Sequence, residues 1–237
     1  MRIITIDNGN TNPHVGIFEN NQLLKVIPLI EFSKNSSDFI LISSVGEKIS
    51  LSPNINLIHY YNKNNFFNMP VNYSMTLGID RLLTSYFVFK NNFKLDKSDK
   101  ILIIDAGTFI TIDLVSIQGF EGGYIFPGIK KFLNIYQSGA QLPNLDLNHF
   151  LNEKNNIPST PNNTNDAIIG ATHFFIESIL ENILRIIKPN KIIITGGTGE
   201  LILNKLVSLT KIQTEIHPHL IHYSIHQIYQ EHFHLRS

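Results

Sequence analysis

The sequence contains no cysteine, which excludes disulfide bonds and metal sites with thiolate ligands. It also lacks a basic excess, because 19 lysines and arginines balance 19 aspartates and glutamates to a formal net charge of zero. Proteins that bind nucleic acids usually carry such an excess, so we expect no nucleic-acid partner. The absence of cysteine is compatible with a cytoplasmic location.

Long apolar runs are missing as well. The apolar residues near the N-terminus stop at Asp7, which is too early for a secretory signal peptide. No apolar stretch approaches the roughly 20 residues needed to cross a bilayer, so we expect a cytoplasmic protein with no membrane partner. The 237 residues are 43% apolar, which is enough for the core of one large domain or two compact lobes.

Two segments repeat one pattern, in which a short β-branched run leads into an Asp-x-Gly turn and then a second strand-like run. Aligning Asp7 with Asp105 also aligns Gly9 with Gly107 and the apolar residues before each turn. Such a match between distant segments indicates an internal duplication. The predicted strands of the two copies span residues 2–6, 14–18, 23–29, 100–104 and 109–115.

The remaining pattern alternates helices with strands and predicts an α/β protein. Apolar residues at helical spacing predict a helix after residue 81, a second over residues 166–187 and a third over about residues 200–209. Thr164 is a candidate N-cap of the second helix. Further strands are predicted over residues 41–45 and 191–195. The polar stretch over residues 91–100 predicts two domains, 1–95 and 96–237.

An Asp-x-Gly turn after a strand suits phosphate chemistry. The glycine lets backbone N–H groups approach an anion, and the carboxylate can hold Mg²⁺ together with phosphate oxygens. A single such turn is a weak signal, because Asp and Gly are ordinary turn residues. Two copies at matching positions of a repeat favour a nucleotide-phosphate site that includes Asp7 and Asp105.

Several blocks of the sequence together resemble the type III pantothenate kinase family. The turn from Asp7 to Thr11, the block Gly78-Ile79-Asp80-Arg81 and the turn from Asp105 to Thr108 are similar to its three signature blocks, in the same order. The segment from Gly122 to Gly128 resembles its Gly-Gly-x-Ile-x-Pro-Gly motif. Further similar segments lie at residues 42–45, 164–167 and 195–197.

This resemblance implies an actin-like ATPase and kinase fold of two ribonuclease-H-like lobes, and transfer of phosphate from ATP to pantothenate in the first step of coenzyme A biosynthesis. It implies Mg²⁺ at Asp7, K⁺ or NH₄⁺ at Asp105, Asp80 as general base and a homodimer. The residues that it assigns to ATP and its phosphates are Asp7, Asn8, Gly9, Asn10, Thr11 and Thr108. Those that it assigns to pantothenate are Tyr73, Gly78, Ile79, Asp80, Arg81 and, from the partner subunit, Thr164.

Four residues depart from the family pattern, namely Asn8, Pro13, Phe109 and Thr198, and we expect Pro13 to interrupt the second strand. Two other functions stay open: a non-catalytic regulatory accessory factor of the same fold, and a kinase for another small alcohol.

Two of these features can also be explained by an ordinary structural role. Asp80 can be a first-turn helix residue rather than a base. His222 and His226, spaced for one helix face, can be a metal-ligand pair or polar surface.

Overall fold

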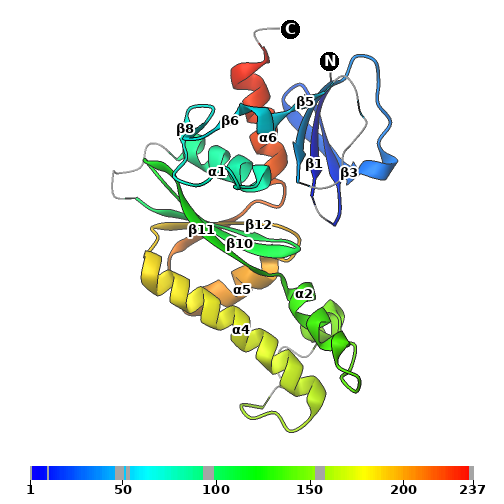
Figure 1. Cartoon of the computed structure of the whole chain (residues 1–237), viewed down its shortest axis with the longest axis vertical. Helices are drawn as coiled ribbons and strands as arrows, with labels where there is room; N and C mark the ends of the chain where they lie inside the picture. Colours follow the sequence, from blue (N-terminus) through cyan, green and yellow to red (C-terminus); the bar gives the residue numbers. More distant parts are fainter. Residues whose placement is uncertain are drawn as a thin grey trace. The chain divides into compact units, whose positions relative to one another are not determined.

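The computed structural model describes residues 2–9, 11–45, 51, 54–92, 99–152 and 158–234 (Figure 1). Asn10 and the predicted domain boundary at residues 95 and 96 lie outside these residues. The chain forms two compact units. The first comprises Met1–Ile103, Asp113–Gly123 and His219–Ser237, and the second comprises Ile104–Ile112 and Tyr124–Pro218.

Two five-stranded sheets have the same strand order, which confirms the predicted duplication. In each sheet the first strand in the chain is central, the next two follow it on one side, and the last two lie on the other side. One sheet runs β3 (Gln22–Pro28), β2 (His14–Glu19), β1 (Ile3–Asn8), β4 (Phe39–Ser44), β5 (Ile55–Asn56). The other runs β11 (Gly119–Pro127), β10 (Phe109–Ser116), β9 (Ile101–Ala106), β12 (Lys191–Thr195), β13 (Gln213–Ile216).

The pairing around β1 brings distant segments of the chain together. β1 is antiparallel to β2 and parallel to β4, so the end of β1 lies between the start of β2 and the end of β4. β1 and β4 are almost wholly buried, and isoleucine and leucine supply half of the residues in each. Pro13 precedes β2 and does not interrupt it, so the expectation of a broken strand was wrong.

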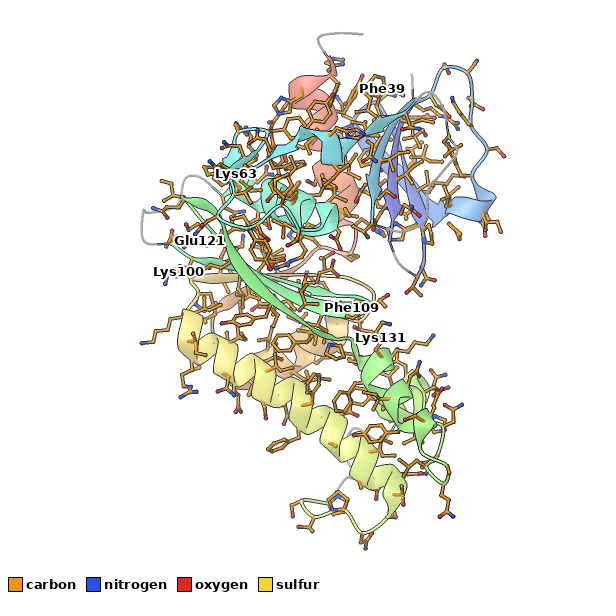
Figure 2. The ribbon with its side chains drawn as sticks, viewed as in Figure 1. Phe39, Lys63, Lys100, Phe109, Glu121 and Lys131 are labelled. Carbon is orange, nitrogen blue, oxygen red and sulfur yellow. The ribbon has the colours of Figure 1, made fainter. Side chains whose placement is uncertain are left out.

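The first unit also contains helices α1 (Ile79–Asn91) and α6 (Leu220–His232), which pack side by side (Figure 1). α6 packs against β1, β2 and β4, and Phe39 of β4 lies 5.0 Å from Tyr229 between ring centroids (Figure 2). The unit is completed by the short strands β6 (Tyr61–Asn62), β7 (Asn65–Phe66) and β8 (Met69–Pro70) and by the 3₁₀ turns η1 (Leu29–Glu31) and η2 (Leu57–Tyr60).

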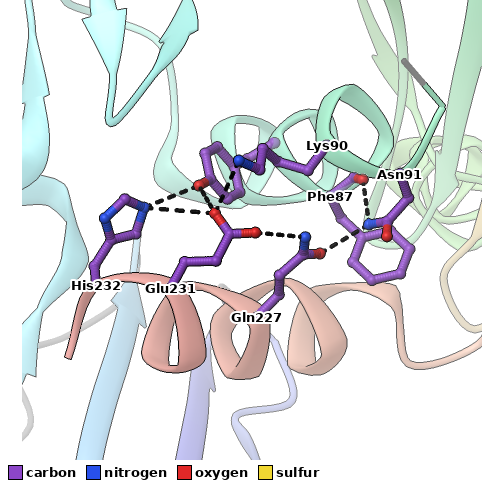
Figure 3. A network of polar contacts seen from close by, with 7 residues as sticks. Phe87, Lys90, Asn91, Gln227, Glu231 and His232 are labelled. Atoms are coloured by element: carbon purple, nitrogen blue, oxygen red, sulfur yellow. Dashed lines mark hydrogen bonds and ion pairs between the residues drawn. The ribbon is translucent and has the colours of Figure 1, made fainter. Parts of the chain in front are cut away.

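A polar network joins α1 to α6 (Figure 3). Glu231 accepts hydrogen bonds at 2.8 Å from both the Tyr86 hydroxyl and Gln227, and it pairs with Lys90 at 3.0 Å. Asn91 donates to Gln227 at 2.8 Å and so extends the network along both helices. Because the block with Asp80 begins α1, this network helps to fix that block in the unit.

The second unit carries helices α2 (Ile129–Asn134), α3 (Leu147–Asn152), α4 (Thr164–Ile187) and α5 (Gly199–Leu209), with η3 (Ile135–Ser138). Asn163, not Thr164, caps α4, because its side chain accepts a hydrogen bond from the Asp166 N–H at 3.0 Å. α4 packs against α2 and α5. By length and composition alone this 24-residue helix could span a membrane, which the sequence analysis did not anticipate, although a core helix passes the same test.

Candidate active site

The first acidic turn begins at Asp7, whose carboxylate is half-buried at the end of β1. Asn8 follows with a buried side chain, which donates to the Ser44 hydroxyl at 2.8 Å. The Asn8 carbonyl accepts from the Val45 N–H at 3.2 Å. The residue that departs from the family pattern therefore ties the turn to the end of β4. Thr11, at the end of the predicted turn, is exposed.

A line of side chains extends from Asp7 into the core of the unit. The Asp7 Oδ2 and His14 Nε2 atoms are 3.7 Å apart, and His14 Nδ1 lies 2.9 Å from His222 Nε2. His222 Nδ1 lies 2.7 Å from the Thr5 hydroxyl, which donates to the Gly16 carbonyl at 3.2 Å. Burial lowers the pKa of His222 to about 3, and it also lowers the pKa of His14.

His222 and His226 both lie on α6, as their spacing predicts, but they are not polar surface. His222 is fully buried against β1 and β2, and His226 stacks on Phe18 with 4.1 Å between ring centroids. No group of three or more metal-ligating side chains is found among the described residues. The sequence could not reveal this burial, because the residues that cover both rings lie some two hundred positions earlier in the chain.

The second acidic turn is enclosed by backbone. Asp105 is half-buried near the end of β9, and Gly196 lies directly against it. A Cβ atom on Gly196 would come within 2.5 Å of Asp105 Oδ1, and the residue has a φ of +88°, so only glycine fits this position. The Ala106 carbonyl accepts from both the hydroxyl and the N–H of Thr198, at 2.8 and 3.0 Å. Thr198, which departs from the family pattern, thus holds the loop that contains Gly196 against the turn at Asp105.

The Gly-Gly-x-Ile-x-Pro-Gly segment ends on the same turn. Any Cβ atom on Gly128 would collide with the carbonyl groups of Gly107 and Thr108, and the Gly128 N–H donates to Thr108 at 3.2 Å. Phe109 is exposed beside it, with the Lys131 ammonium 4.8 Å from its ring centroid (Figure 2). Thr108 therefore lies on a turn that is packed against the backbone of Gly128, and the side chain of the next residue, Phe109, contacts the Lys131 ammonium.

The block Gly78 to Arg81 forms the start of α1. Gly78 is the N-cap, and its lack of a side chain leaves room for the Asp80 carboxylate, which a Cβ atom there would displace. Asp80 is half-buried in the first turn, where the helix dipole favours a negative charge. The geometry is compatible with both the ordinary first-turn role and a role as base. Ile79 is buried and anchors the block.

Arg81 is held in a buried ion pair that the sequence analysis missed. Its Nε donates to Asp113 at 3.0 Å, and a second nitrogen pairs with the same carboxylate. Its guanidinium carbon lies 5.4 Å from the Tyr73 ring centroid and 5.5 Å from that of Phe120. The structure therefore brings the predicted substrate residues Tyr73 and Arg81 together. The sequence did hold a signal for this ion pair, because a carboxylate within the otherwise apolar strand β10 needs a partner when it is buried.

Thr164 is the first residue of α4 and is exposed. A groove of about 1180 Å³ is lined by residues of α4 together with residues of β11 and α5. Phe174, which is 74% exposed, and Ile186, which is 62% exposed, lie in the lining of this groove. An apolar helix face of this kind is typical of protein interfaces.

Comparison with known proteins identifies the family. Residues 47–185 match the family model described as type III pantothenate kinase. The type III pantothenate kinase of Campylobacter hominis is 32% identical over 201 residues, which cover 84% of this chain and 87% of that protein. The chain belongs to the type III pantothenate kinase family. Members of this family are ATP-using kinases.

Solved structures confirm the fold of this pantothenate kinase family member. A protein from Campylobacter jejuni described as a Baf family transcriptional activator superposes with a TM-score of 0.64 at 23% identity, covering 96% of this chain and 98% of that one. The activator of 2-hydroxyisocaproyl-CoA dehydratase from Clostridium difficile, with bound ADPNP, gives a TM-score of 0.54 at 10% identity and covers 95% and 92%. These likenesses confirm the predicted actin-like α/β fold.

Proposed function

We propose that this chain transfers the γ-phosphoryl group of ATP to the primary hydroxyl of pantothenate, giving 4′-phosphopantothenate for coenzyme A biosynthesis. The observation that carries the proposal is the arrangement at the start of α1, where Asp80 precedes an Arg81 that is fixed beside Tyr73. This arrangement lies within the part of the chain that matches the family model.

Asp80 is the proposed general base. In the transfer, the bond between the γ-phosphorus and the β–γ bridging oxygen breaks, and a bond from the pantothenate oxygen to that phosphorus forms. The hydroxyl proton passes to the Asp80 carboxylate, and ADP leaves. Apart from accepting this proton, the protein needs mainly to position the two substrates and to neutralise the charge of the phosphates.

Arg81 and Tyr73 are the proposed pantothenate contacts, together with the backbone of Gly78 and Ile79. Asp113 already holds Arg81 from one side, so the guanidinium is a rigid donor rather than a mobile cation. Planar guanidinium groups recognise carboxylates well, and pantothenate carries a carboxylate. Tyr73 adds a half-exposed ring next to it.

The two acidic turns are the proposed nucleotide and cation sites. Asp7 supplies a half-buried carboxylate that suits Mg²⁺, with Asn8, Gly9, Asn10 and Thr11 as the phosphate turn. Asp105 is half-buried on a turn that is packed against the backbone of Gly196, and its carboxylate is the proposed site of the monovalent cation, K⁺ or NH₄⁺. Thr108, on the same turn, is the proposed ATP contact. The bound metal would neutralise phosphate charge.

The proposed assembly is a homodimer formed through α4, in the cytoplasm. The exposed apolar face of α4 and its groove support this, because a lone soluble domain rarely leaves such a face uncovered. Thr164, exposed at the start of α4, would then reach the partner's pantothenate.

A coupled ATP-consumption assay tests the function, run over a panel of small alcohols that includes pantothenate, with and without K⁺. Asp80→Asn removes the proton acceptor with little change of shape and should lower kcat by about 10²–10⁴-fold. Glu31→Gln, which neutralises an exposed carboxylate, is the matched control and should retain the wild-type rate. A near-normal kcat for Asp80→Asn would refute the base assignment.

The panel also separates the two rival functions. Turnover of another alcohol in preference to pantothenate would identify a kinase with a different acceptor. No turnover of any acceptor, with nucleotide binding intact, would favour a regulatory accessory factor.

A further inference from the structure

The two acidic turns carry negative charge but no positively charged side chain. Residues 7–11 and 105–108 contain no lysine or arginine, and neither does the glycine loop over residues 196–199. The carboxylates of Asp7 and Asp105 offset much of the charge of the cations proposed there. A bound triphosphate therefore still needs a positive partner from the protein, and in phosphoryl-transfer enzymes this partner is commonly lysine or arginine.

Helix α2 carries a lysine to the second of these turns. The start of the helix is fixed because Gly128, its N-cap, packs so closely that a Cβ atom there would lie 2.6 Å from the Thr108 carbonyl oxygen. Ile129 and Leu133, which are buried and lie about one helical turn apart, anchor one face of α2. Lys131 lies midway between them in sequence, so it projects from the opposite face and is exposed.

The ring of Phe109 holds this lysine beside the turn. Phe109 directly follows Thr108 and is 41% exposed, and the Lys131 ammonium lies 4.8 Å from its ring centroid (Figure 2). Such a contact at an exposed site is attractive but weak. In the part of the chain that the structure describes, Lys131 forms no ion pair, so no carboxylate competes for its charge. The ammonium is therefore held near the turn by a contact that a phosphate group can replace.

We propose that Lys131 binds the phosphate groups of ATP at the second turn, and that Phe109 positions its ammonium for them. This role rests on the proposed function in taking the turn at Thr108 as a nucleotide-phosphate site. Phe109 departs from the family pattern, so the pair does not follow from the resemblance. An ammonium on a phosphate oxygen makes a charge-assisted hydrogen bond, which is stronger than the ring contact that it replaces.

Binding of Mg²⁺-ATP to the full-length protein, measured by isothermal titration calorimetry with K⁺ and without pantothenate, is the test. Lys131→Gln should weaken ATP binding about tenfold, the effect of losing one hydrogen bond between charged groups. Lys131→Arg keeps the charge and should retain most of the affinity. Lys130→Gln removes the neighbouring exposed lysine and is the matched control, which should bind ATP as wild type does. Both glutamine variants change the net charge equally, so a general electrostatic effect would weaken both.

A second pair of variants tests the positioning role of Phe109. Phe109→Leu removes the ring and should weaken ATP binding about two- to fivefold, whereas Phe109→Tyr keeps the ring and should bind ATP as wild type does. In a protein that already carries Lys131→Gln, Phe109→Leu should have no further effect, because the ring acts through the lysine. A merely structural role of the ring would instead make the two effects additive.

Equal ATP affinity of wild type and Lys131→Gln, or equal losses in Lys131→Gln and Lys130→Gln, would overturn the binding role of Lys131. Additive losses in the double variant would overturn the positioning role of Phe109. A wild-type protein that binds no ATP would refute the nucleotide site itself, and with it both this inference and the proposed function. ATP binding that depends on Lys131, without phosphorylation of pantothenate, would refute the proposed function alone, so the two failures are distinguishable.

Discussion

His226→Phe should make the protein less sensitive to acid. His226 is only 5% exposed, stacks in parallel on Phe18, and has no hydrogen-bond partner for Nε2 in the described part of the chain. Burial lowers its pKa to about 4, against about 6.5 in an unfolded chain. Between these values the unfolded chain binds a proton that the folded chain does not, so stability falls as the pH falls.

The size of this effect follows from the pKa difference. At pH 5.0 the unfolded histidine is about 1.5 pH units below its pKa, which corresponds to about 2 kcal/mol of lost stability. This contribution is fully present above about pH 6.5 and is lost progressively toward pH 4. Phenylalanine preserves the stacked ring and cannot be protonated, so the variant should lose about 2 kcal/mol less than wild type.

Urea denaturation followed by circular dichroism at pH 7.5 and pH 5.0 measures the difference. His222 is retained in both proteins, so its own contribution cancels. His59→Gln, an exposed histidine, should show the same pH dependence as wild type. If wild type and His226→Phe lost equal stability between the two pH values, the ring would not be held neutral by burial and the reasoning would fail.

Three further changes test other parts of the molecule. Asp113→Asn should cost about 3–5 kcal/mol in thermal denaturation, because it leaves buried Arg81 without its counter-charge. Gly16→Ala should destabilise by about 1–3 kcal/mol through its clash with His222, whereas Gly197→Ala, with open space at the Cβ position, should change little. Phe174→Glu on the exposed face of α4 should convert the proposed dimer to the 27.0 kDa monomer. Light scattering at micromolar concentration measures the mass, and a wild-type protein that is already monomeric would contradict the dimer.

The central strands were predictable because their signal is local. Runs of isoleucine and leucine that stop at an acidic turn placed β1 and β9 to within two residues at each end. The strand over residues 191–195 was predicted without error. The duplication could be predicted for the same reason, since both copies need a buried central strand with a polar turn at its end.

Features that depend on distant partners could not be predicted in this way. The periodicity of α6 does not say that His222 lies against Thr5 and His14, because that contact depends on how α6 packs on the first sheet. Asp113 was overlooked because its partner Arg81 precedes it by a helix and a strand. The N-cap of α4 was misplaced by one residue, since Asn163 and Thr164 are both good capping residues and only the backbone geometry decides between them.

The two acidic turns share their topology but differ in what surrounds the carboxylate. At the first turn the His14 ring lies 3.7 Å from the Asp7 carboxylate, and five residues of the sequence separate β1 from β2. At the second turn only residues 107–108 connect the strands, and glycines 128 and 196 bring backbone against it. A divalent cation is bound best by charged or strongly donating side chains, whereas a monovalent cation is bound well by carbonyl oxygens with one carboxylate. This divergence accords with the proposed divalent cation at Asp7 and the proposed monovalent cation at Asp105.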